Sequence, residues 1–288
     1  MFQKLLQKRW LGIFCLLVLL TSVSFAKDKK VTIYGVTTTN QLISFESETP
    51  GDVTTVGAIT GLQTGENILG IDFRPMNEQL YALGSSSRLY TISLTNGAAT
   101  FVSTLSVSLA GDSFGVDFNP VTDRLRVTSD VDQNLSVNVD TGQVTVDSPL
   151  TAAGPPPDPT IGASAYSNNF VGATTTTLYN IDYFRDRFVT QNPDSAGRQM
   201  RIGELSPTAT PPLGNDITNE FVSLDIAGSK NVAYASLTMP NAANSSLYTI
   251  DLATGEATLV GAIGGGTVVR GISVAFGKLK KKQKDKSE

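Results

Sequence analysis

Acidic residues recur at one place in a repeated sequence pattern, and they are the side chains best suited to chemistry in this chain. Asp72 lies in GIDFRP, Asp117 in GVDFNP and Asp225 in SLDIAG, while Ser273 in GISVAF and Ala165 take the same place. If the repeats fold side by side, the carboxylates converge and repel one another unless a cation, an Arg or water intervenes. Ca²⁺ accepts such an all-oxygen set, with carbonyls and waters completing about six to eight ligands.

A structural role is the competing interpretation of these four residues. Each side chain would then accept hydrogen bonds from backbone amides of the neighbouring repeat and hold the repeats together. Because the packing of the sheets recurs with each sequence repeat, a repeated Asp is more naturally structural than catalytic. We favour this role, keep the metal site as the alternative and assign no catalytic residue. Arg74 and Asn119 follow two positions later on the same strand face, and Arg74 is a candidate partner for an Asp of a neighbouring repeat.

Residue types that are missing exclude several classes of catalyst. The chain has no His, one Cys and one Trp, and both Cys15 and Trp10 lie within the first 26 residues. Ser-His-Asp hydrolysis, Cys nucleophiles and His- or Cys-ligated zinc are therefore excluded for the remainder of the chain. The oxygen-rich segments Asp130–Asn134 and Asp194–Arg198 lack the closing Glu of a calcium loop and are predicted to be turns. The Thr174–Thr177 run suits a strand, and its hydroxyls would also suit a sugar-binding groove.

A two-part repeat of about 45 residues extends through the chain. One part, seen in LYTISLTNGAATFV from Leu89 and LYTIDLATGEATLVG from Leu247, is an alternating strand, a turn and a second strand, which predicts a β-hairpin. The other part, GIDFRPMNEQLYALG and GVDFNPVTDRLRVTS, begins at Gly70 and Gly115, 45 residues apart. Together they form a four-stranded antiparallel unit, which has the length and strand count of a β-propeller blade.

The repeats predict an all-β fold, a β-propeller of four-stranded antiparallel blades, five in number. Full blades are expected at residues 68–105, 113–150, 160–205 and 220–262. The first blade has only three strands, near residues 31–36, 41–46 and 53–58. A last strand, Val268–Phe276, is expected to complete it and close the ring, which removes exposed sheet edges. Six blades are the alternative, if the proline-rich segment 149–220 contains an irregular blade.

The order of these motifs resembles the bacterial secreted family named domain of unknown function 4394. The resemblance rests on GIDFRP, GVDFNP and LYTIDLATGEATLVG, and on AYSNN, TTTTLYNID and VTQNP between them. It covers roughly residues 31–276. It implies a secreted, propeller-like domain and transfers no catalytic residue, because the family has no established activity.

The two ends of the chain differ in composition from the repeats. Residues 1–26 combine a basic start, an apolar stretch and a small-residue site ending at Ala26, the pattern of a signal peptide. Residues 27–30 are a short linker, residues 31–277 a single propeller domain and residues 278–288 a Lys-rich tail, predicted to be disordered. The tail would also suit an anionic surface. We expect a secreted or periplasmic protein.

Charge and repeat pattern favour binding over catalysis. Residues 31–277 contain 10 basic and 23 acidic residues, which disfavours nucleic acid as a partner. We expect a monomeric, non-catalytic binding or scaffolding module without a cofactor, whose partner is a protein or an envelope component. A Ca²⁺-dependent, lactonase-like propeller hydrolase with a carboxylate base is the alternative. A structural envelope protein tethered by the tail is a third reading.

Overall fold

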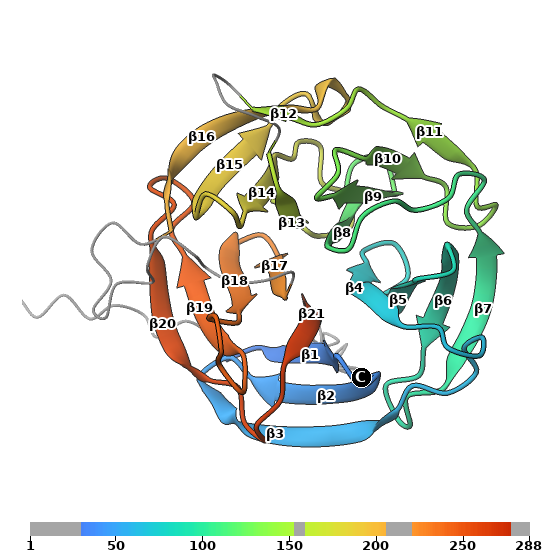
Figure 1. Ribbon diagram of the computed structural model, residues 1–288, viewed down its shortest axis with the longest axis vertical. Coiled ribbons are helices and arrows are strands. Elements are labelled where there is room, and N and C mark those ends of the chain that lie inside the picture. The colour runs from blue at the N-terminus through green and yellow to red at the C-terminus, as the bar shows by residue number, and fades with distance from the viewer. Residues whose placement is uncertain (1–29, 153–158, 206–220, 278–288) are drawn as a thin grey trace, which may run out of the picture.

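Five β-sheets are arranged as blades around a central axis in the computed structural model, which describes residues 30–152, 159–205 and 221–277 (Figure 1). From the axis outward, the strands of blade 1 are β21 (Val269–Val274), β1 (Thr32–Thr37), β2 (Gln41–Glu46) and β3 (Thr49–Ala58). Those of blade 2 are β4 (Ile68–Arg74), β5 (Gln79–Gly84), β6 (Arg88–Ile92) and β7 (Ala99–Thr104).

The other three blades follow in chain order. Blade 3 consists of β8 (Phe114–Asn119), β9 (Arg124–Ser129), β10 (Asn134–Val137) and β11 (Val144–Val146). Blade 4 consists of β13 (Ile161–Tyr166), β14 (Leu178–Asp182), β15 (Arg187–Gln191) and β16 (Arg198–Glu204). Blade 5 consists of β17 (Val222–Ala227), β18 (Val232–Leu237), β19 (Ser246–Ile250) and β20 (Ala257–Ala262).

The prediction of five antiparallel blades is confirmed. Within the described part of segment 149–220, the chain forms one blade, and the sixth-blade alternative is not observed. This blade differs from the others by a short fifth strand, β12 (Thr151–Ala152), which pairs parallel to β16. A three-residue 3₁₀ helix, η1 (Asp194–Ala196), lies in the predicted Asp194–Arg198 turn. No helix of the described residues has the length and apolarity to cross a membrane.

The two ends of the described chain close the ring. Strand β21 pairs antiparallel with β1, so that Ser273 lies opposite Tyr34 and Val274 opposite Ile33. Blade 1 is therefore built from both ends of the domain, as the spare C-terminal strand predicted. The predicted signal peptide and Lys-rich tail lie outside the described residues.

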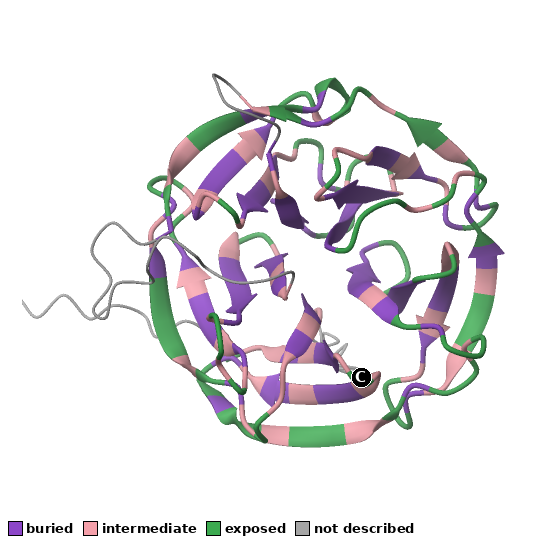
Figure 2. Cartoon of the chain, viewed as in Figure 1, coloured by how far each residue is buried: buried purple, intermediate pink, exposed green. Residues whose placement is uncertain are grey.

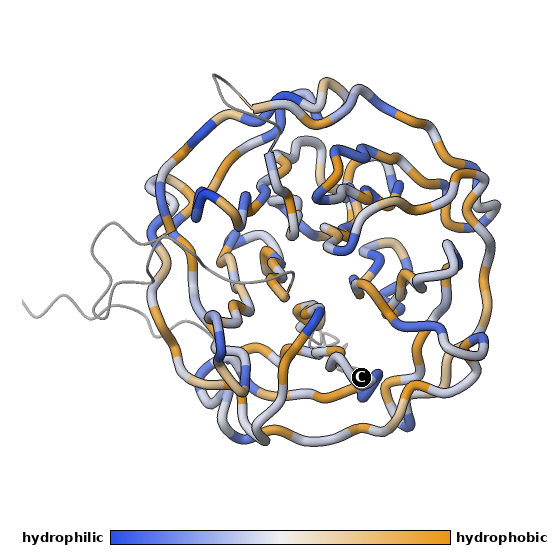
Figure 3. The backbone as a smooth tube through the Cα atoms, in the orientation of Figure 1, coloured by the Kyte–Doolittle hydropathy of each residue, from blue (hydrophilic) through white to orange (hydrophobic). Residues whose placement is uncertain are grey.

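Burial decreases from the axis to the rim. Every residue of the innermost strand β8 is buried, whereas half of the residues of the outer strand β7 are exposed and only one is buried (Figure 2). Hydrophobic residues recur along the strands of every blade (Figure 3), and successive side chains point to opposite faces of a sheet. Consecutive positions of innermost strands such as β8 and β13 are buried, so each of these blades buries both of its faces against its two neighbours.

Apolar packing joins most pairs of neighbouring blades but is weak at one interface. Large apolar clusters join blade 1 to blade 2, blade 2 to blade 3, blade 4 to blade 5 and blade 5 to blade 1. Between blades 3 and 4 the apolar cluster consists of Leu150, Ile161 and Val189. Polar side chains occupy much of this interface, and they are described with the candidate site.

Turns at the rim dock onto the preceding blade, and their geometry requires glycine. In the β10–β11 turn, Gly142 has φ 74°, and a Cβ there would lie 2.0 Å from the carbonyl oxygen of Thr104. The Gly142 carbonyl accepts a hydrogen bond from the Ser106 N–H at 2.9 Å. The Asn-Gly or Thr-Gly pairs of the repeat therefore fix both the turn and the spacing between blades.

We predict that Gly142→Ala destabilises the domain more than Gly172→Ala. Both positions have positive φ, which costs an Ala roughly 1–2 kcal/mol, but Gly172 has no atom within 4 Å of an added Cβ. The difference between the variants therefore isolates the close approach of blades 2 and 3. Urea unfolding measures it, and equal free energies of unfolding would contradict the docking role of this turn.

Candidate functional site

Three carboxylates converge at the centre of the ring, as their repeated position predicted. Asp72, Asp117 and Asp225 lie on the innermost strands β4, β8 and β17, and each is only 1% exposed. One oxygen of each lies within 4.8 Å of the others. The Ser273 hydroxyl, on β21, lies 2.8 Å from Asp72 Oδ1 and 3.0 Å from Asp225 Oδ2.

These side chains also link four of the five blades to the next. In each of these four blades, the side chain accepts a hydrogen bond from the next blade. The donor is the backbone N–H of the residue that follows the equivalent position there. The four bonds are Asp72 from Phe118 at 2.8 Å, Asp117 from Tyr166 at 3.0 Å, Asp225 from Val274 at 2.6 Å and Ser273 from Phe73 at 3.1 Å. Blade 4 has Ala165 at this position, which offers no acceptor. The contacts support the structural interpretation of the repeated Asp.

Two carboxylate oxygens of the cluster are buried without a hydrogen-bond partner among the described residues. They are Asp117 Oδ2 and Asp225 Oδ1. Both oxygens of Asp72, in contrast, accept hydrogen bonds, Oδ1 from Phe73 N–H and Oδ2 from Phe118 N–H. A buried carboxylate oxygen without a partner is costly, so either a retained proton or a cation would stabilise this cluster.

Burial and mutual repulsion favour the protonated forms of the three acids. Desolvation, and then the charge of Asp225, raise the pKa of Asp72 well above its ordinary value. Desolvation raises the pKa of Asp117 in the same way, with further contributions from Asp72 and Asp225. Desolvation raises the pKa of Asp225 to about 6, although hydrogen bonds from Val274 and Ser273 oppose the shift. Because the groups interact, their protons belong to the cluster as a whole.

The donor set fits a cation in part. Carboxylate and hydroxyl oxygens are the ligands that Ca²⁺ prefers, and the free oxygens of Asp117 and Asp225 are available to it. The Asp72 oxygens and the Ser273 hydroxyl are already engaged in bonds between blades. The predicted metal ligands thus lie together, but they serve the fold at the same time.

Residues two positions beyond the central Asp contact the next blade further outward. The guanidinium of Arg74 is 2.5 Å from Asp123 Oδ2 and 2.8 Å from Asp140 Oδ1, both in turns of blade 3. These carboxylates raise the pKa of Arg74 further. Arg74 therefore pairs with a neighbouring blade, but with turn carboxylates rather than with the central Asp. The amide of Asn119 similarly donates to Asp194 in blade 4 at 3.2 Å.

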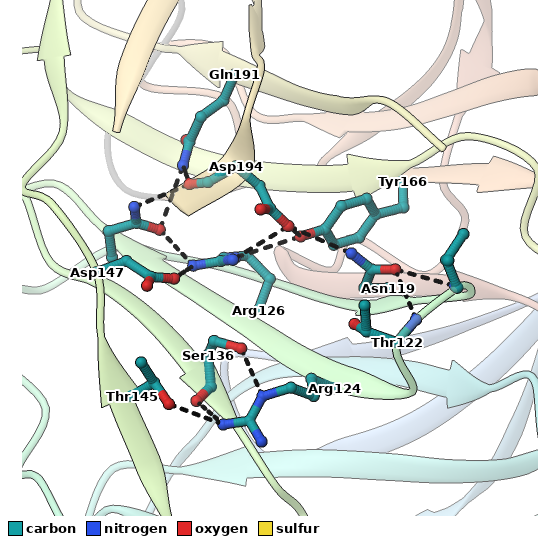
Figure 4. A network of polar contacts seen from close by, with 12 residues as sticks. Asn119, Thr122, Arg124, Arg126, Ser136, Thr145, Asp147, Tyr166, Gln191 and Asp194 are labelled. Atoms are coloured by element: carbon teal, nitrogen blue, oxygen red, sulfur yellow. Dashed lines mark hydrogen bonds and ion pairs between the residues drawn. The ribbon is translucent and has the colours of Figure 1, made fainter. Parts of the chain in front are cut away.

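A buried polar network fills the interface between blades 3 and 4, and sequence reasoning did not identify it (Figure 4). The guanidinium of Arg126, 4% exposed, lies 2.7 Å from Asp147 and 3.1 Å from Asp194. The Tyr166 hydroxyl donates to Asp194 Oδ2, and the Gln191 amide donates to the Asp194 carbonyl. One signal was available: in the aligned repeats, Arg126 stands where blade 2 has Tyr81 and blade 5 has Tyr234.

Hydrogen bonding fixes the charges of this network. Burial opposes ionisation of Asp194, but the hydrogen bond from Tyr166 and the charge of Arg126 outweigh it and lower the pKa of Asp194. Burial raises the pKa of the Tyr166 hydroxyl, which stays neutral. The pKa of Arg126 is raised despite burial, because Tyr166, Asp147 and Asp194 surround it. Asp194 is thus a carboxylate and Arg126 a cation at neutral pH.

Three cavities open at the end of the ring where the innermost strands finish, which we call the strand-end face. One of about 290 Å³ includes Ala227 and Val274, one of about 240 Å³ includes Asn119 and Tyr166, and one of about 500 Å³ includes Phe73. None of these cavities is lined by a central Asp. The surface cavities and the buried carboxylates therefore lie in different parts of the molecule.

Five antiparallel sheets around an axis, linked through their innermost strands and closed by the two ends of the chain, define a five-bladed β-propeller. The chain belongs to the family described as "Domain of unknown function (DUF4394)", whose family model matches residues 41–273. The resemblance found in the sequence motifs is thereby confirmed. No curated protein matches the sequence.

Solved structures similar to this chain share its fold at low sequence identity. A protein of unknown function from Bacteroides thetaiotaomicron VPI-5482 is 12% identical with a TM-score of 0.50, over 81% of this chain and 56% of that one. A chain of a nidogen/laminin complex is 14% identical with a TM-score of 0.47, over 86% and 99%. TolB from Acinetobacter baumannii is 11% identical with a TM-score of 0.42, over 81% and 53%. At such identities the likeness concerns the fold alone.

We predict that Asp117→Ala destabilises the domain by about 1–3 kcal/mol, because the buried N–H of Tyr166 loses its acceptor. Asp117→Asn keeps an acceptor of the same size and is the matched control, with a smaller loss expected. Urea unfolding measures both free energies. An Ala variant as stable as the parent would show that the blades do not depend on this bond.

We also predict that the central acids make stability fall as the pH rises. Their pKa values are raised in the folded protein, to about 6 for Asp225, whereas an unfolded Asp titrates near ~3.9. The stability that the protonated acids contribute to the folded protein is therefore fully present below pH ~3.9 and is lost as the pH increases through about 6. Melting temperatures between pH 4 and 8, in EDTA, should decline more for the parent than for Asp225→Asn. Parallel profiles for the two proteins would contradict the shift.

Proposed function

We propose that this propeller is a non-catalytic binding module, secreted or periplasmic, that presents its strand-end face to a partner. One observation carries the proposal. Among the described residues, Asp72, Asp117 and Asp225 are the one group of three carboxylates close enough to share a metal ion; each is 1% exposed, accepts a hydrogen bond from a backbone N–H of the next blade and is absent from the lining of the three strand-end cavities. Groups in that position hold the ring together and have no contact with a substrate.

The features left for interaction are on the surface. Three cavities share the strand-end face, and their lining residues lie at the ends of strands and in the loops that connect them. Residues 31–277 carry more than twice as many acidic as basic residues, which disfavours nucleic acid. We propose a monomer that binds a protein or an envelope component, with the Lys-rich residues 278–288 contacting an anionic surface.

A cation-dependent, lactonase-like hydrolase is the second candidate, and the unpartnered oxygens of Asp117 and Asp225 favour it. Such an enzyme must bring its substrate to the metal, so its metal-binding carboxylates should line an open cavity. The cavity bordered by the residues just before the central Asp, among them Ile71 and Val116, measures only about 10 Å³. A Ca²⁺ ion at the centre would thus suit a structural role better than a catalytic one.

An experiment with two readouts distinguishes the candidates. We predict that millimolar Ca²⁺ and EDTA give melting temperatures within a few degrees of each other, and that aryl esters and lactones are not hydrolysed under either condition. A calcium-dependent turnover that disappears in Asp117→Asn would overturn the non-catalytic proposal. A calcium-dependent increase in melting temperature without turnover would instead identify a structural ion and leave the binding function standing.

The binding function itself is tested by co-sedimentation of the chain with isolated cell-wall sacculi. We expect sedimentation in moderate salt, and a variant lacking residues 278–288 should lose the salt-sensitive part of it without a change in melting temperature. Absence of sedimentation in both low and moderate salt would contradict the cell wall as the envelope partner.

A further inference from the structure

The cleft between blades 3 and 4 combines a rigid floor with a polar wall. It measures about 240 Å³, below the roughly 300–1,000 Å³ of pockets that enclose drug-sized ligands, so it suits a unit of one small ring. Its lining includes Val121, Thr122, Tyr166, Gln191, Asn192, Asp194 and the run Thr174–Thr177. Its residues come from three loops of the strand-end face and from the ends of β8, β13, β14 and β15.

The floor of the cleft is held in place by hydrogen bonds within the protein. The Gln191 amide donates to Asn134 and to the Asp194 carbonyl, and its oxygen accepts from Asn180 and Gln199. The Tyr166 hydroxyl is bonded to Asp194 and Arg126. A ligand would therefore meet side chains that are already oriented, which lowers the entropic cost of binding.

The wall, in contrast, offers polar groups that the protein does not use. Five polar side chains of the wall form no hydrogen bond with the described residues: the hydroxyls of Thr122, Thr174, Thr175 and Thr177 and the amide of Asn192. All of these residues are exposed except Thr177, which is half-buried. The contacts of Asp194 with Asn119, Tyr166 and Arg126 all use Oδ2. Its Oδ1 is free to accept, and the side chain is 27% exposed. Several donors and acceptors thus line one small cleft.

Charge restricts the kind of ligand. Asp147 and Asp194 surround the one guanidinium of Arg126, which leaves a net negative charge beside the cleft. Arg126 is 4% exposed and cannot reach a ligand, so an anion would find no cationic partner there. A hydroxyl-rich neutral molecule matches better, because it can donate to Asp194 and exchange hydrogen bonds with the threonines. Val121, 44% exposed, offers an apolar contact for a C–H face.

We propose that the blade 3–4 cleft binds one ring of a neutral saccharide. The proposal rests on the binding function proposed above and names its ligand class. Thr174, Thr175 and Asn192 supply hydrogen bonds from the wall, and Asp194 accepts from a ring hydroxyl. The Thr174–Thr177 run, which suits a strand by propensity, is placed by the fold where its hydroxyls can serve recognition.

A panel of neutral mono- and oligosaccharides, screened with the full chain and followed by calorimetric titration of the tightest binder, tests the proposal. The double variant Thr174→Val/Thr175→Val removes two exposed hydroxyls and keeps side-chain shape. We expect its dissociation constant to rise at least tenfold with an unchanged melting temperature. The matched control is Thr54→Val/Thr55→Val on the exposed outer strand β3, which should bind like the parent.

The outcomes separate this inference from the proposed function. If no saccharide of the panel binds, or if the Thr174/Thr175 variant binds as tightly as the parent, the saccharide site is overturned. Sedimentation with sacculi that persists in that case would leave the binding module standing with a different site. Weakened binding in the Thr174/Thr175 variant, with the Thr54/Thr55 control unchanged, places the saccharide in this cleft.

Discussion

The hydrogen bond from an innermost-strand side chain to the backbone of the next blade is the contact on which this ring depends. It joins blade 2 to 3, 3 to 4, 5 to 1 and 1 to 2, with Asp or Ser as acceptor. Because five blades meet around a narrow axis, placing an acceptor on four of the innermost strands brings the acceptors together. The carboxylate cluster, with its raised pKa values, is a consequence of this way of joining blades.

Blade 4 breaks the pattern in two respects that concern the same region. Its innermost strand carries Ala165 in place of an acceptor, and its interface with blade 3 is polar rather than apolar. There Arg126, Tyr166 and Asp194 form a satisfied network in place of a hydrophobic cluster. Such a network costs more to bury than apolar side chains, but it fixes orientation, and the cleft it supports opens at the strand-end face. The departure from the repeat thus coincides with the cleft between blades 3 and 4.

The repeat made most of the fold predictable. The blade limits, the three-strand first blade and the closing strand followed from alternating strands and from turns with Gly, because these patterns are local and recur. The convergence of Asp72, Asp117 and Asp225 followed from the same register. The side-chain partners of the Asp194 carboxylate, in contrast, lie 28 to 75 residues away and occur once, so no periodicity pointed to them.

The sequence by itself predicted the strand order and the residues that face the axis, since alternation and turn chemistry act over a few neighbouring residues. It favoured five blades and left six open, and the structure decided for five. It also limited chemistry after the first 26 residues to oxygen ligands and carboxylates, because His and Cys are absent there. Only the tertiary structure decided that these carboxylates are buried and committed to backbone amides, and that Thr174 and Thr175 border an accessible cleft. Accessibility depends on how separate blades pack against one another, and a local pattern carries no information about that packing.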